Sequence, residues 1–205
     1  MKTLLAVVLV IASTLPETAG AQQKPPAPSG GAQLAGRQLT VDDILKLAIH
    51  DVSPEFISEI EAQGYKGLGI DDLTAMRIHG VDAAYIAEMR KAGYDKLAID
   101  QLVATRIHGA TPAFMQELKA AGYDKLNIDD LIAMRIHGVS AQFIRELKEV
   151  GYGSVSKDRL VAFRIHGVDA DFIREVQKAG LKNVSEDDLV SLAIHGGLRW
   201  LQRMK

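Results

Sequence analysis

Apolar residues along the chain fall into two helical patterns that alternate and recur every 29 residues. In the first pattern apolar side chains recur at helical spacing, as Leu73, Met76 and Ile78 show. The second begins with an aromatic residue and continues with aliphatic ones, as in Phe143 and Ile144. Each pattern predicts a short amphipathic helix, so each copy of the repeat predicts a helical hairpin.

Polar residues mark both ends of the first helix in each hairpin. The helix begins after a residue ten places before a histidine, and these residues are Thr40, Gly69, Ala98, Asn127, Ser156 and Ser185. Ser, Thr and Asn accept a hydrogen bond from the first turn, whereas Gly69 and Ala98 are weaker caps. The helix ends at the histidine, and the six histidines are His50, His79, His108, His137, His166 and His195. Glycine follows in five copies and Asp51 in the first, which is the usual place of a left-handed residue.

The second helix of each hairpin has equally clear limits. Its predicted caps are Ser53, Asp82, Thr111, Ser140 and Asp169. It stops before a glycine, and these glycines are Gly64, Gly93, Gly122, Gly151 and Gly180. Four of these glycines precede a tyrosine and the last precedes Leu181, and we expect these side chains to fold back on the preceding turn.

A single hairpin cannot bury its apolar face, but stacked hairpins form a continuous core. The sequence therefore predicts an all-α fold, an α-solenoid of six 29-residue helix-turn-helix repeats whose last copy is degenerate. The segment 198–204 departs from the repeat as a terminal cap does. We expect Trp200, the only tryptophan, to cover the end of the core.

The first part of the chain predicts export. Residues 1–21 combine Lys2, a short apolar run and a small-residue cleavage site, as a signal peptide does. The run is too short for an ordinary membrane span, although an uncleaved anchor is the alternative. Residues 22–38 are rich in Pro, Gly and Gln and predict a disordered linker, so the repeat domain covers 39–205. We expect a periplasmic or extracellular protein without membrane insertion once the signal is removed. The chain has no cysteine, so disulfides do not contribute to stability.

Two charged rows recur with the repeat. Their members interleave along the chain as Glu59, Arg77, Glu88, Arg106, Glu117, Arg135, Glu146, Arg164 and Glu175. Every arginine stands between two glutamates, which predicts a structural ladder of ion pairs between adjacent repeats. The alternative is an Arg/His edge that binds an anionic small ligand.

The six histidines have two interpretations besides a metal site. Neighbouring helices lie about 8–10 Å apart, too far for successive imidazoles to share one zinc ion, so we expect no metal. We expect each imidazole to cap the last carbonyl groups of its helix. A collective response to pH is the alternative, because imidazole titrates near pH 6.5.

The sequence contains no motif of a nucleophile, zinc peptidase or phosphate-binding loop, and we expect a protein that is not an enzyme and has no cofactor. The net charge of −2 disfavours nucleic acid. The positions that vary between copies form a stripe on the second helices, which becomes basic in later copies. Its cations are candidates for partner binding: Arg90, Lys119, Arg145, Lys148, Arg174 and Lys178. An ordinary solvated surface is the alternative.

The pattern R-I-H-G-V, followed by F-I-x-E-L and A-G-Y, resembles bacterial helical-hairpin repeats. Some of those repeats are attached to antirepressor-type membrane metallopeptidases of the beta-lactam-sensor class. The resemblance covers residues 39 to about 197 and concerns the repeat unit alone, because the peptidase motif is missing. It implies an accessory or sensing module outside the cytoplasm. We expect a monomeric scaffold for a protein or peptide partner, with a periplasmic sensor of an anionic ligand as the alternative.

Overall fold

A computed structural model describes residues 33–203 of the chain, without the side chains of residues 201 and 202. The predicted signal peptide and residues 22–32 of the predicted linker lie outside the described residues. The described part contains two short strands and twelve helices. Their bounds are β1 Gln33–Leu34, β2 Arg37–Gln38, α1 Val41–Ile49, α2 Pro54–Ala62, α3 Ile70–Ile78, α4 Ala83–Lys91, α5 Ile99–His108, α6 Pro112–Ala120, α7 Ile128–Ile136, α8 Ala141–Glu149, α9 Lys157–His166, α10 Ala170–Lys178, α11 Glu186–Ile194 and α12 Gly197–Arg203.

The predicted caps stand where the helices begin. Thr40 accepts a hydrogen bond from the backbone N–H of Asp43, and Asn127, Ser156 and Ser185 make the equivalent bond in their copies. Gly69 and Ala98 are N-caps without a side-chain hydrogen bond. All five predicted caps of the even-numbered helices α2 to α10 also accept a bond from the first turn. These predictions are confirmed.

Left-handed residues end the odd-numbered helices α1 to α11, as predicted. The glycine after each histidine has a φ between 68° and 72°. Asp51 takes the same conformation with a φ of 55°. Aspartate tolerates this region better than most residues that carry a side chain, which explains why it substitutes for glycine in the first copy.

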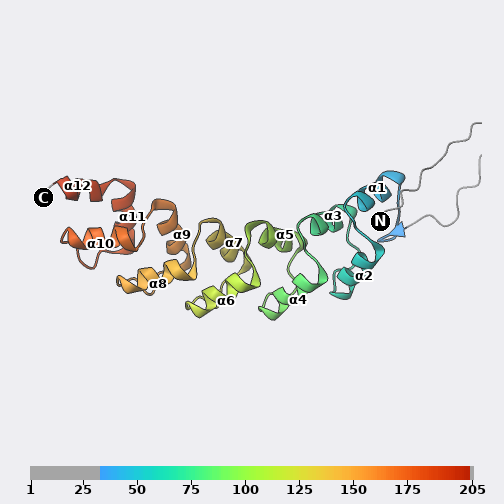
Figure 1. Cartoon of the computed structure of the whole chain (residues 1–205), viewed down its shortest axis with the longest axis horizontal. Coiled ribbons are helices and arrows are strands. Elements are labelled where there is room, and N and C mark those ends of the chain that lie inside the picture. Colours follow the sequence, from blue (N-terminus) through green and yellow to red (C-terminus); the bar gives the residue numbers. More distant parts are fainter. Residues whose placement is uncertain (1–32, 204–205) are drawn as a thin grey trace, which may run out of the picture. The chain divides into compact units, whose positions relative to one another are not determined.

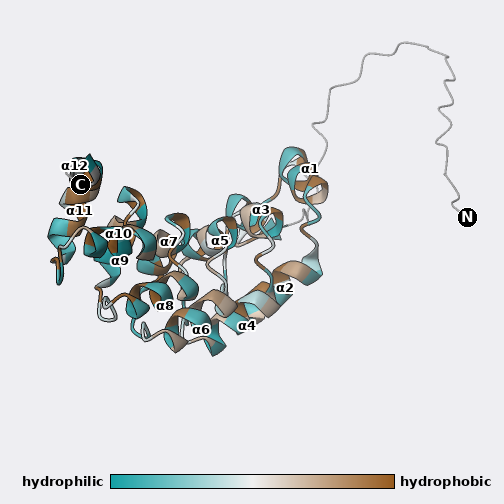
Figure 2. Ribbon diagram, turned by 60° about the vertical axis from the view of Figure 1, so that its left-hand side comes forward, coloured by the Kyte–Doolittle hydropathy of each residue, from teal (hydrophilic) through white to brown (hydrophobic). Residues whose placement is uncertain are grey.

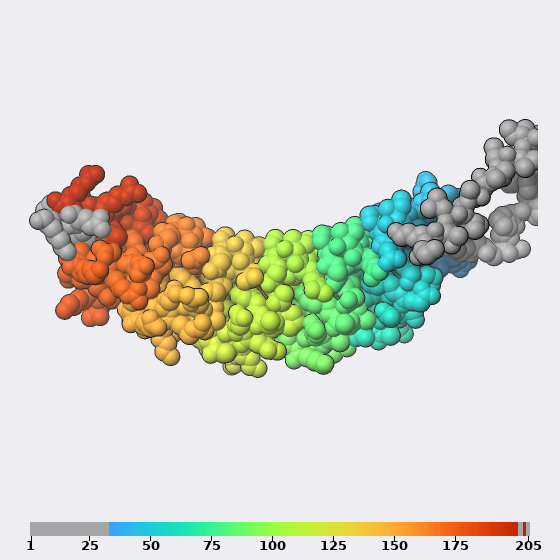
Figure 3. Space-filling view, viewed as in Figure 1, coloured from blue at the N-terminus to red at the C-terminus, as the bar shows by residue number. Residues whose placement is uncertain are grey.

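Alternate helices pack against one another. Each odd-numbered helix from α1 to α9 contacts the next odd-numbered one, and contacts also join α2 to α4, α6 to α8 and α8 to α10. Figure 1 shows the odd-numbered helices α1 to α11 and the even-numbered helices α2 to α10 as two rows, with α12 beside α11, and Figure 2 shows that helices carry both apolar and polar portions. On the face that Figure 3 shows, segments follow one another in sequence order. The all-α class is confirmed. A solenoid of six repeats stays an interpretation of the 29-residue period, with which these contacts agree.

The core follows from this packing. The residue six places before each histidine is 0–1% exposed in the last five copies, and these residues are Leu73, Leu102, Leu131, Leu160 and Leu189. Each lies on a helix that packs against the preceding odd-numbered helix. The equivalent Ile44 is 46% exposed, because no helix precedes α1 among the described residues.

Two sequence-based expectations about the ends are wrong. Residues 33–38 of the predicted disordered linker form an antiparallel hairpin, in which Leu34 pairs with Arg37. Ala35 and Gly36 both have positive φ, as a tight hairpin turn requires. At the other end, Trp200 is 62% exposed and does not cover the core. Leu198 is the residue of this segment that packs against the core. No helix within residues 33–203 is long and apolar enough to cross a membrane.

Candidate functional site

The arginine row contacts the preceding repeat, but it does so through aromatic rings. The guanidinium carbons lie 3.9–5.3 Å from ring centroids, in the pairs Arg77–Phe56, Arg106–Tyr85, Arg135–Phe114 and Arg164–Phe143. No ion pair among residues 33–203 joins this arginine row to the glutamate row. The predicted Glu–Arg ladder, from Glu59 to Glu175, is therefore wrong.

The position of each arginine explains why it contacts an aromatic ring and not a glutamate. Each arginine sits near the end of an odd-numbered helix, where the preceding hairpin presents the first aromatic residue of its even-numbered helix. A guanidinium can stack on a ring face and make a cation–π interaction with it. Arg164 also donates to the carbonyl of His137 at 3.4 Å, at the negative end of α7. The first copy has Ala48 in this position and no preceding ring. The structure does not explain Ala193 in the last copy, where Phe172 is left partly exposed.

The tyrosines join successive hairpins, which sequence reasoning did not anticipate. Each hydroxyl donates to a backbone carbonyl 32 residues later, at 2.5–2.9 Å, in the pairs Tyr65–Leu97, Tyr94–Leu126, Tyr123–Val155 and Tyr152–Val184. Burial raises the pKa of all four phenols. Leu181 takes the place of tyrosine after α10. The signal was the fixed spacing of these four tyrosines, which Leu181 interrupts in the fifth copy.

A polar pair lies inside the core beside this row. The Tyr85 hydroxyl donates to Thr105 Oγ1 at 2.7 Å, and Thr105 donates in turn to the Leu102 carbonyl at 2.7 Å. Other copies place Phe at the tyrosine position and an apolar residue at the threonine position. The buried Thr74 hydroxyl, in contrast, has no hydrogen-bond partner among the described residues.

The two threonines predict opposite effects of one substitution. Thr74→Val is expected to raise the free energy of unfolding by about 1 kcal/mol, because it removes a buried hydroxyl without a partner. Thr105→Val is expected to lower it by about 1–3 kcal/mol, since the Tyr85 hydroxyl then loses its acceptor. Thermal melting followed by circular dichroism measures both. Shifts of equal sign would contradict the hydrogen-bond assignment.

A row of isoleucines is exposed to solvent and does not contribute to the core. The isoleucine before each histidine is between 52% and 76% exposed, and this isoleucine row consists of Ile49, Ile78, Ile107, Ile136, Ile165 and Ile194. Each lies two residues beyond a core position such as Met76, hence about 200° around the helix from it. The exposure is thus a property of the repeat in all six copies.

The histidines lie beside this row and face solvent. Five are exposed and His50 is intermediate. No imidazole donates or accepts a hydrogen bond among the described residues, so the predicted side-chain caps are not formed, although every histidine stands at the end of its helix as expected. No group of three metal-ligating side chains is present within the described residues. An aspartate seven residues before each isoleucine is exposed near the other end of the helix, so carboxylates and imidazoles flank the row.

The predicted basic stripe is partly neutralised. Arg90 pairs with Asp95 at 2.9 Å and also donates to the carbonyl of Gln63. Arg174 pairs with Asp171 at 2.7 Å and lies 3.9 Å from Glu149, and Lys178 pairs with Glu175 at 2.8 Å. The other three stripe residues, Lys119, Arg145 and Lys148, have no ion pair among the described residues. About half of the basic side chains of the stripe are thus already paired with carboxylates. A role of the stripe in binding stays a prediction.

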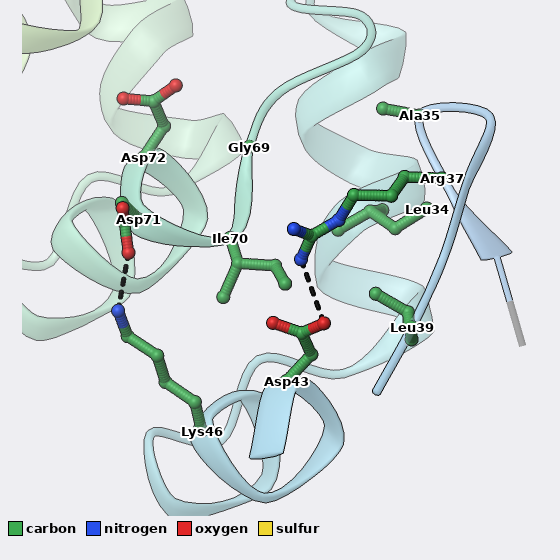
Figure 4. A pocket seen from close by; sticks show the side chains of 10 residues that line it. All are labelled: Leu34, Ala35, Arg37, Leu39, Asp43, Lys46, Gly69, Ile70, Asp71 and Asp72. Carbon is green, nitrogen blue, oxygen red and sulfur yellow. Dashed lines mark hydrogen bonds and ion pairs between the residues drawn. The ribbon is translucent and has the colours of Figure 1, made fainter. Parts of the chain in front are cut away.

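An open cavity of about 620 Å³ lies between the N-terminal hairpin, α1 and α3 (Figure 4). Both cations of the cavity are paired, since Arg37 lies 2.8 Å from Asp43 and Lys46 pairs with Asp71, whereas Asp72 has no ion pair among the described residues. The backbone N–H of Thr40 lowers the pKa of Asp43, and a hydrogen bond from Lys46 lowers that of Asp71. Both carboxylates stay ionised at neutral pH and neutralise the two cations, which leaves the cavity poorly suited to an anionic ligand.

The isoleucine row and the histidines beside it recur in every copy and are not part of the core. They are therefore the candidate site for binding. Comparison of the sequence with protein-family models and with curated proteins finds no match. The resemblance to the metallopeptidase-linked repeats therefore stays a prediction, carried by the repeat unit alone.

Proposed function

We propose that this protein is an exported, non-enzymatic helical scaffold that binds a protein or peptide partner along the isoleucine row. One observation carries the proposal: the same large apolar side chain is more than half exposed in all six copies. An apolar side chain that is exposed at the same position of every copy offers a partner one repeated contact along the array of helices. Export is supported by the sequence pattern of residues 1–21.

Energetics favour a partner that spans several copies. Five of the six isoleucines are about half covered already, so their complete burial contributes about 1 kcal/mol per side chain. Association costs about 4–15 kcal/mol, which a ligand that covers one or two isoleucines does not offset. Six positions at helix-packing distances extend over about 40–50 Å, the length of about 12–15 residues of extended chain. A long peptide segment or a helix fits this row better than a small molecule does.

The alternative of an anionic small ligand has less support. The arginines that would form its edge lie over aromatic rings, and Arg77 also pairs with Asp51. A second cavity, which includes Arg164 and Arg174, is lined by four carboxylates as well. Carboxylates in such numbers repel an anion.

The test uses a phage-displayed peptide library selected on the purified protein. Peptides enriched on the native chain are expected to lose at least tenfold in affinity for the variant Ile107→Glu/Ile136→Glu, because glutamate places charge in the middle of the row. The control variant Lys119→Glu/Arg145→Glu changes exposed residues of the basic stripe and should bind as the native chain does. Loss of binding in the control alone would transfer the site to the stripe and contradict the proposal.

A further inference from the structure

One face of α1 is uncovered, although the equivalent face of α3 is buried. Val41, Ile44 and Leu45 are 72%, 46% and 53% exposed. The equivalent residues of α3 are 8%, 1% and 5% exposed: Ile70, Leu73 and Thr74. Because α1 packs against α3 and no described helix precedes α1, the first copy lacks the neighbour that every later copy has.

The opposite end of the helical array also exposes apolar side chains. Trp200 of α12 is 62% exposed and Leu181, before α11, is 39% exposed. Apart from the isoleucine row, the large apolar side chains exposed within residues 33–203 all lie at these two ends. Tryptophan is enriched at the centres of protein interfaces, since it combines a large apolar surface with little side-chain entropy.

The two ends carry opposite charge. The first hairpin has exposed carboxylates without an ion pair among the described residues: Asp42, Glu55, Glu59 and Glu61. Of the basic side chains at this end, Arg37 and Lys46 are already paired, and only Lys66 is exposed without an ion pair among the described residues. The last copy exposes basic side chains without an ion pair among the described residues: Lys182, Arg199 and Arg203. Two of its carboxylates, Glu186 and Asp187, are paired with Arg159.

We propose that a second copy of this chain covers α1, with the α12 end of one molecule against the α1 face of the next. Contact between two α1 faces would oppose acidic hairpins, whereas contact of α1 with α12 joins acidic to basic surface. Such a head-to-tail contact leaves one free end at each side and therefore continues into longer assemblies. It replaces the monomer that the sequence alone suggested, and it is independent of the isoleucine row.

Sedimentation velocity of the purified protein over a concentration series tests the proposal. The native chain is expected to form assemblies larger than a dimer as its concentration rises, and to dissociate in high salt because the ends attract by charge. Leu45→Glu blocks one end and Trp200→Glu blocks the other. Each variant alone is expected to stay monomeric, and an equimolar mixture is expected to form a dimer and nothing larger, since one intact head meets one intact tail.

Other outcomes overturn the proposal in distinguishable ways. If Trp200→Glu alone still dimerises, two α1 faces meet and the head-to-tail arrangement is wrong. If the native chain stays monomeric at every soluble concentration, the exposed ends do not associate. Ile107→Glu serves as a control, because a change in the isoleucine row should leave self-association unchanged. Circular dichroism verifies that each variant keeps its helix content.

Discussion

Replacing Leu131 with alanine is expected to lower the free energy of unfolding by about 3 kcal/mol. Leu131 is 1% exposed on α7, which packs against both α5 and α9. The truncation leaves a cavity between helices that contact only near neighbours, so little of the surrounding structure can collapse to fill it. Urea unfolding followed by circular dichroism measures the loss.

Ile44→Ala is the matched control for this prediction. Ile44 occupies the same repeat position but is 46% exposed, so its truncation is expected to cost about 1 kcal/mol or less. The comparison is made in dilute solution, where copies of the chain do not associate. Equal costs at the two positions would mean that α1 is covered in the isolated molecule, which would contradict the exposed face described above.

Replacing the four tyrosines of the interhairpin bonds with phenylalanine is expected to cost about 4 kcal/mol in total. Each hydroxyl-to-carbonyl bond contributes about 1 kcal/mol net, and sites in different hairpins add nearly independently. The variant changes Tyr65, Tyr94, Tyr123 and Tyr152. The midpoint of thermal unfolding should fall by about 2–4 °C for each kcal/mol.

Two observations separate this effect from a general loss of packing. Leu181→Tyr is expected to change stability by less than about 0.5 kcal/mol, because none of the described residues lies 32 positions later to accept its bond. The raised pKa of the tyrosines also predicts that the native chain loses stability as the pH rises above 10, where the unfolded phenols ionise first. The phenylalanine variant should show less of this loss, and the part that remains belongs to Tyr85, whose pKa is also raised by burial. A variant with an unchanged melting temperature would show that the four bonds contribute nothing net.

The arginine row illustrates what a sequence pattern leaves open. The regular alternation of arginine and glutamate correctly indicated that each arginine contacts another repeat. It predicted glutamates as the contacted groups, whereas the structure has aromatic rings. Spacing along the chain cannot distinguish a carboxylate from a ring when both recur with the same period. The tyrosine row was missed for a related reason, since its acceptors are backbone carbonyl groups, which every residue carries.

The isoleucine row was visible in the sequence but was interpreted as part of the helical apolar pattern. Ile78 and Met76 are two residues apart on one helix, and whether both are buried depends on where the neighbouring helices lie. Exposure of Ile78 therefore required the packing of α3 against α1 and α5. The same holds for Trp200, because the sequence of a terminal segment does not show whether its aromatic side chain is buried or exposed.

The amino-acid sequence by itself determined the helices of this protein, their caps and their ends, because these depend on interactions within a few residues of each other. Side-chain caps, left-handed glycines and apolar spacing act locally and need no knowledge of the fold. The tertiary structure alone decided which apolar side chains face solvent, which ring each arginine covers and which carbonyl each tyrosine reaches. Those contacts join residues 20–32 positions apart, and their geometry is set by how one hairpin packs on the next.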